Sequence, residues 1–158
     1  MTEELVTFET AKLAKEKGFD EECGHVWEYF VSDGEVYGPN AWPNPTITDW
    51  RKETPETREI FQHRPYMFNP NTRVKNSTLE HWLFARPTQD LLERWLREKY
   101  GLLVCALPWY KPIPKRETWT SFVMGKDQHM YAGDSIELDT YELAREAALQ
   151  QALNLIKS

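Results

Sequence analysis

The chain has 158 residues, of which 41% are hydrophobic and 28% are charged, and its formal net charge is −6. This length and composition are typical of one soluble globular domain, residues 1–158, with its own hydrophobic core. No stretch approaches the roughly 18 consecutive apolar residues of a membrane span, and the acidic N-terminus does not resemble a secretory signal, so we expect a cytoplasmic protein without membrane contact.

The charge is distributed unevenly along the chain. Residues 1–50 carry a net charge of −8, residues 51–126 carry +6, and residues 127–158 carry −4. The basic middle suits an anionic partner or the acidic ends of the same fold. Overall acidity argues against non-specific nucleic-acid binding as the main task, because that binding depends on accumulated positive charge.

The N-terminal third predicts a helix followed by a β-hairpin. Thr7 is a suitable N-cap and Gly18 a suitable residue just beyond the C-terminus, which indicates a helix over 8–17. The β-forming run that starts at Val26, the turn sequence "SDG" and the pair Val36-Tyr37 then predict a hairpin.

The middle of the chain, residues 39–87, is weakly regular. Three prolines within 39–45 disfavour regular structure. A short helix from Thr54 to about His63 and a capping box formed by Ser77 and Glu80 are the local signals. A long irregular section of this kind often serves as a binding surface or contains elements that the pattern does not reveal.

The best-organised stretch is "ARPTQDLLERWLREKYGLLV", residues 85–104. Thr88 is a good N-cap, an apolar stripe from Leu91 to Leu96 lies opposite a charged face, and Gly101 can end the helix over 88–100. The run 102–107 has no polar residue on either face, which is typical of a central strand buried on both sides. The pattern of this helix and strand therefore predicts a structural role, because it does not bring polar residues together at one point.

The C-terminal third predicts two strands and the longest helix. A proline-interrupted connection leads to a strand over 118–124 and a second over 129–138, bulged near Gly133. Asp139 and Glu142 form a capping box for a helix over 140–157. The fold class is α+β, with an antiparallel or mixed sheet of about four or five strands packed by three main helices.

No motif assigns an enzymatic activity. Cys23 and His25 are close, but zinc needs two further ligands and the other histidines form no second pair. The same two residues would suit an activated thiol only if the fold brought them together. Neither a nucleotide-binding glycine loop nor a G-x-S-x-G elbow is present. We therefore expect no metal, no cofactor and no catalytic residues, and a non-catalytic protein is favoured.

Binding is the best-supported class, because basic and aromatic residues alternate in the middle section. Such a pattern suits a protein partner or single-stranded nucleic acid, unless the aromatics belong to the core and the arginines are merely solvated. The candidate binding residues are Trp42, Trp50, Arg51, Lys52, Arg58, Arg64, Tyr66, Arg73, Lys75 and Arg86.

Three segments carry a resemblance to other proteins. "RPTQDLLERWLREKYGLLV", "DTYELAREAALQQALNLI" and the N-terminal "ETAKLAKEKGFD" resemble a set of small proteins from gut Bacteroidetes, many of them encoded by phages or prophages. The resemblance covers about half of the chain and implies no activity. It implies a bacterial host and a phage or mobile element as the source. Together with the aromatic excess and the long irregular section, this favours a non-catalytic accessory protein that binds a protein partner, and the alternative is nucleic-acid binding by the basic middle.

Overall fold

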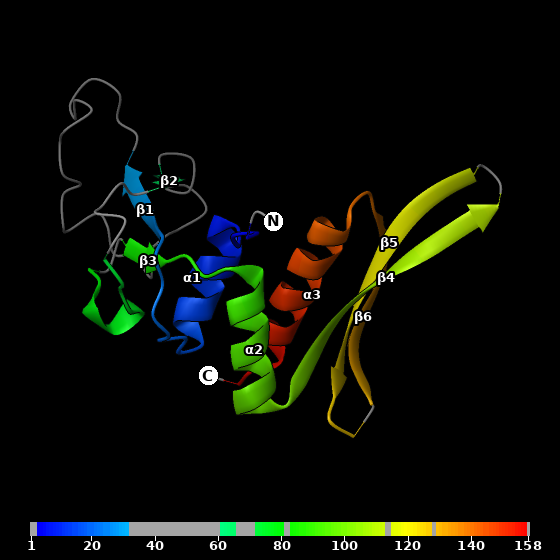
Figure 1. Ribbon diagram of the computed structural model, residues 1–158. Helices are drawn as coiled ribbons and strands as arrows, with labels where there is room; N and C mark the ends of the chain where they lie inside the picture. The colour runs from blue at the N-terminus through cyan, green and yellow to red at the C-terminus, as the bar shows by residue number, and fades with distance from the viewer. Residues whose placement is uncertain are drawn as a thin grey trace. The chain divides into compact units, whose positions relative to one another are not determined.

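A computed structural model describes residues 3–31, 61–65, 72–80, 83–112, 115–127 and 129–157. The chain forms two compact units (Figure 1). Unit 1 comprises Met1–Phe19 together with Pro87–Ser158, and unit 2 comprises Asp20–Arg86. Within the described residues, no helix is both long and apolar enough to cross a membrane.

The predicted α+β class is confirmed, with three α-helices and antiparallel strand pairing in the described part of the chain. The strands form two three-stranded sheets, with the orders β2-β1-β3 and β4-β5-β6. The helices and strands are α1 (Phe8–Glu16), β1 (Val26–Val31), β2 (Phe61–Pro65), β3 (Leu83–Ala85), α2 (Gln89–Tyr100), β4 (Leu102–Pro112), β5 (Lys115–Gly125), β6 (Met130–Leu138) and α3 (Tyr141–Leu155), with a 3-10 turn, η3 (Asn76–Thr78).

The ends of α1 and α2 lie where local chemistry predicts them. The Thr7 side chain accepts a hydrogen bond from the backbone of Thr10, and Thr88 accepts one from Leu91. Both helices are followed by glycines in the left-handed region, Gly18 at φ 83° and Gly101 at φ 69°. These glycines adopt a conformation that other L-residues rarely occupy, and so they terminate the helices.

The N-cap of α3 differs from the predicted capping box. Thr140, not Asp139, caps the helix, because its side chain accepts a hydrogen bond from the backbone of Leu143. Two adjacent residues of good capping type compete here, and the chain entry from β6 selects the second. The helix and its C-terminal cap bury an apolar face formed by five residues, Ala148, Leu149, Ala152, Leu153 and Ile156.

In unit 1 the helix α3 packs on one face of the β4-β5-β6 sheet and contacts α1 and α2 on its other sides. Figure 1 shows α3 in orange and red between the sheet and these two helices. Val123 and Ser121 on β5 are buried beneath it, and the Gln151 side chain of α3 lies 3.5 Å from the Ser121 hydroxyl. The core of unit 1 therefore includes this face of the sheet and α3, together with buried residues of α1 and α2 such as Phe8, Leu92 and Leu96.

The prediction that 102–107 is a central strand is wrong. In the described sheet β4 pairs only with β5, so β4 is an edge strand and β5 is central. The predicted proline-interrupted connection is instead the end of a long hairpin, because β4 continues to Pro112 and β5 begins at Lys115. An edge strand tolerates prolines, since half of its backbone N–H groups have no strand partner.

Unit 2 is built around β1, which pairs with β2 on one side and with β3 on the other. The predicted helix from Thr54 is wrong at its C-terminal end, where Phe61–Pro65 is a strand. The capping box of Ser77 and Glu80 is also wrong: η3 begins after Lys75, and the Thr78 side chain bonds to the Lys75 backbone. The predicted "SDG" turn lies outside the described residues.

Candidate functional site

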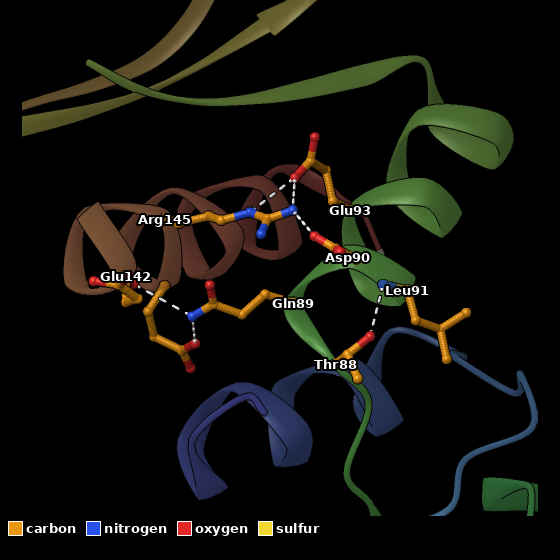
Figure 2. Close-up of polar contacts among 8 residues, drawn as sticks. Thr88, Gln89, Asp90, Leu91, Glu93, Glu142 and Arg145 are labelled. Atoms are coloured by element: carbon orange, nitrogen blue, oxygen red, sulfur yellow. Dashed lines mark hydrogen bonds and ion pairs between the residues drawn. The ribbon is translucent and has the colours of Figure 1, made fainter. Parts of the chain in front are cut away.

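A buried polar cluster joins the three helices of unit 1. One carboxylate oxygen of Glu146 on α3 accepts hydrogen bonds from the Thr7 backbone N–H, at 2.8 Å, and from the Thr7 hydroxyl, at 2.7 Å. Its other oxygen accepts one from the Gln89 side chain at 3.0 Å, and that amide also reaches the Glu142 carbonyl (Figure 2). Thr7 caps α1 and Gln89 begins α2, so the carboxylate lies at the positive ends of both helix dipoles.

A second contact between α2 and α3 lies at the edge of this cluster. The guanidinium of Arg145 bonds to the carboxylates of Asp90 and Glu93 on α2, as Figure 2 shows. Burial of the guanidinium opposes its charge, but the hydrogen bonds to Glu93 and Asp90 outweigh that effect and raise the pKa of Arg145. Glu93 therefore serves the packing of α2 against α3.

These polar groups hold the helices together, and their geometry points to a structural role. Each Glu146 oxygen already accepts a hydrogen bond from the protein. Arg94 and Arg97 on α2 are exposed, so they do not join the cluster. Within unit 1, the buried residues of α2 are Gln89, Leu92, Trp95 and Leu96.

The opposite face of the β4-β5-β6 sheet offers a different kind of site. Residues paired directly across an antiparallel ladder share a face, and the register pairs Leu103 with Met124, Cys105 with Phe122, Leu107 with Thr120 and Trp109 with Thr118. Because α3 covers the face of Ser121 and Val123, these eight residues lie on the side that points away from α3. We call this surface the open face.

The open face is mainly apolar, and its far end is exposed on β4, whereas Thr118 of β5, opposite Trp109, is buried. Leu107 is 50% exposed and Trp109 is 56% exposed, while Leu103, Phe122 and Met124 are half-buried. None of its eight residues is charged. Contiguous exposed apolar surface with a large aromatic residue is characteristic of protein-binding sites.

Cationic residues cluster in sequence beyond the open face, at the end of the β4–β5 hairpin. The register places Lys111 opposite Arg116 and Pro112 opposite Lys115. Residues 107–117 carry three basic residues and one acidic residue, Glu117. This stretch of sequence thus carries a net charge of +2, in contrast to the net charge of −6 for the whole chain.

Most of the candidate binding residues of the middle section lie outside the described residues. Those outside are Trp42, Trp50, Arg51, Lys52, Arg58 and Tyr66. Arg64 is in β2 and Lys75 precedes η3. Arg86 stacks on Trp27, with its guanidinium carbon 4.0 Å from the ring centroid, and the Arg73 guanidinium lies against Gly24. Arg86 and Arg73 therefore contribute contacts within unit 2.

The neighbouring Cys23 and His25 do not form an activated thiol. Cys23 is buried and bridges to Val74 through both backbone hydrogen bonds. Desolvation by burial raises the pKa of Cys23 to about 12, against a smaller lowering by the Arg73 charge. A thiol is nucleophilic only as its thiolate, so this cysteine is unreactive in the fold. Within the described ranges, no group of three or more His, Cys, Asp or Glu side chains could hold a metal ion.

The open face was not predicted from the sequence, although the sequence contains a signal for it. The run 102–107 is apolar on both faces, and Trp109 continues the odd-numbered positions. A strand with two apolar faces is either buried twice or offers one face to a partner, and the pattern alone does not distinguish these cases.

Comparisons with known proteins identified no relative of this chain. No protein-family model matches the chain, no curated protein matches its sequence, and no solved structure matches its fold.

Proposed function

We propose that this chain is a non-catalytic binding protein that acts by docking a protein partner on the open face of its β4-β5-β6 sheet. On the resemblance of its ends to small phage-type proteins, we propose that it is an accessory protein of a phage or mobile element. The observation that carries the docking proposal is the exposure of Leu107 and Trp109 on an uncharged apolar sheet face.

The partner we propose has an apolar binding surface with acidic residues on one side. Burial of apolar area supplies most of the affinity in such an interface, at about 25 cal/mol per Å² of apolar surface. Trp109 is of the residue type that most often dominates binding energy. The basic end of the hairpin, with Lys111, Lys115 and Arg116, would orient the partner through charge complementarity.

The proposal is tested by selecting binders from a random peptide library against the full-length protein. We expect enrichment of peptides that combine apolar side chains with acidic ones. Their binding should fall at least tenfold in Leu107→Asp, because a charge on the open face must be desolvated on binding. Thermal unfolding of the variant establishes that it remains folded.

Leu143→Asp is the matched control for this variant. Leu143 lies on α3, away from the open face, and is 52% exposed against 50% for Leu107. The control should bind the selected peptides like the native protein. Selection of no common sequence class, or equal binding by Leu107→Asp and the native chain, would contradict the proposal. Salt-sensitive binding of single-stranded oligonucleotides that Leu107→Asp leaves intact would instead favour nucleic-acid binding.

A further inference from the structure

The outer edge of β4 has none of the usual protection against pairing with another strand over its first half. Within the described sheet, β4 pairs with β5 alone. Natural edge strands are commonly protected by charged side chains, prolines or bulges. In β4 the first proline is Pro108 and the first charged residue is Lys111, so residues 102–107 carry neither.

Two observations indicate which backbone groups of β4 point outward. Pro108 and Pro112 have no backbone N–H and therefore suit positions that do not donate to β5. The Trp109 carbonyl accepts a hydrogen bond from the Thr118 hydroxyl on β5, at 3.1 Å, so the backbone polar groups of Trp109 point towards β5. The backbone N–H and C=O groups of successive residues in a strand point to opposite sides. The even-numbered residues Leu102, Val104 and Ala106 therefore direct these groups away from β5, at the outer edge of the sheet.

We propose that a second copy of this chain pairs with the β4 edge, antiparallel and about a two-fold axis at Val104. In this register Val104 lies opposite the partner's Val104, and Leu102 lies opposite the partner's Ala106. By symmetry Ala106 also lies opposite the partner's Leu102, and each of these three pairs exchanges two backbone hydrogen bonds, about six in all. The β4-β5-β6 sheets of the two copies then become one continuous sheet of six strands. An axis at Cys105 would place Pro108, which cannot donate, opposite the partner's Leu102.

The absence of charge along β4 favours a copy of this chain as the occupant. Two chains that each carry a net charge of −6 repel one another. Residues 102–110 contain no charged side chain, so pairing here buries no charge. The edge also supplies its own complement, because a strand that fits it must be apolar on both faces, as 102–107 is.

This inference does not depend on the proposed function. Pairing uses the backbone edge over residues 102–106, whereas partner docking uses the open face and is tested at Leu107. Pairing would also place the two open faces side by side on one continuous sheet. Failure of either experiment leaves the other unaffected.

A disulfide experiment tests the register directly. With the axis at Val104, Leu103 lies opposite the partner's Cys105 as a non-hydrogen-bonded pair, whose Cα atoms are about 4.5 Å apart. That separation permits a disulfide. The Leu103→Cys variant should therefore form a disulfide-linked dimer under mild oxidation, and the additional change Cys105→Ser should abolish it.

Leu107→Cys is the matched control for the cross-link. It places a cysteine on the same face of the same strand, two residues after Cys105, whereas Leu103 lies two residues before it. In the proposed register it does not lie opposite the partner's Cys105, so it should remain monomeric on a denaturing gel. Equal cross-linking of the two variants, or none in Leu103→Cys, would overturn the inference.

Sedimentation equilibrium provides a second measurement that needs no cysteine variant. The native chain should approach twice its 18.7 kDa mass as its concentration rises. Val104→Pro removes the outward N–H at the axis without removing a bond to β5, so the folded variant should remain at the monomer mass. A native chain that stays at the monomer mass at every concentration would also overturn the inference.

Discussion

Cys23 shows how burial decides the chemistry of a single side chain. Its sequence neighbour His25 suggests an activated thiol, but the folded environment acts in the opposite direction. Desolvation raises the pKa of the thiol from 9.0 to about 12, so the protonated form is favoured in the folded state. Its contribution to stability is therefore fully present below pH 9 and is lost as the pH rises from 9 towards 12.

We predict that Cys23 resists alkylation in the native protein. At pH 8, a shift of three pKa units lowers the thiolate fraction about a thousandfold relative to the unfolded chain. Iodoacetamide labelling followed by peptide mass spectrometry measures the rate, with the urea-unfolded chain as the reference. Labelling of Cys23 at a rate within tenfold of the unfolded chain would show that the thiol is accessible and ionised.

Glu146 is a buried carboxylate that accepts hydrogen bonds from neutral donors of Thr7 and Gln89. Thr7 and Gln89 supply three hydrogen bonds to its two oxygens. Removal of the carboxylate leaves these donors unsatisfied inside the protein. Each unsatisfied buried donor costs about 1–3 kcal/mol.

We predict that Glu146→Ala lowers the free energy of unfolding by about 3 kcal/mol, for the loss of these hydrogen bonds. Glu142→Ala, one turn earlier on the same helix, is the control, because Glu142 is exposed and contributes only its backbone carbonyl to the cluster. The control should change stability by no more than about 0.5 kcal/mol. Urea denaturation measures both variants, and an equal loss in the two would contradict the role assigned to Glu146.

At the scale of the elements, helix ends were predictable and strand roles were not. Thr7, Thr88, Gly18 and Gly101 act within a few residues of their own positions, so local sequence is sufficient to place them. The run 102–107 is a strand, as predicted, but its place at the edge depends on what pairs with it. No local pattern contains that information.

The two helix-terminating glycines provide a matched pair of substitutions. Gly101→Ala and Gly18→Ala both place a side chain at positive φ, which costs about 1 kcal/mol. A Cβ at Gly101 would also lie 3.2 Å from the Lys126 side chain, whereas a Cβ at Gly18 meets nothing within 4 Å. We therefore expect both variants to be destabilised in chemical denaturation, Gly101→Ala more so. A stabilised Gly18→Ala would contradict the assignment of that glycine to a strained position.

At the scale of the whole molecule, unit 2 is an insertion between two parts of unit 1. Phe19 and Pro87 bound the insertion, and the hydrogen bonds of the polar cluster join Thr7 to Glu146 across it. The two sheets belong to different units, so the single sheet of four or five strands expected from the sequence corresponds to two smaller ones. Strand patterns alone do not assign strands to sheets.

We predict that unit 1 folds without the insertion. In the test variant, a Gly/Ser linker of about ten residues replaces Asp20–Arg86. Its helices, sheet and polar cluster all come from the retained segments, so the variant should unfold cooperatively with heat. Circular dichroism at a helical wavelength measures the transition. Absence of a cooperative transition would show that the insertion is needed for the fold of unit 1.

The sequence by itself determined the α+β class, the three helices and most of their ends, and the alternation of faces along β5. These features arise from hydrogen bonds and side-chain periodicity within a few residues. Only the tertiary structure decided that β4 is an edge strand, that α3 covers one face of its sheet, and that Glu146 bonds to Thr7, 139 positions away. The open face is of the second kind, because exposure is set by what packs on a strand and not by the residues within it.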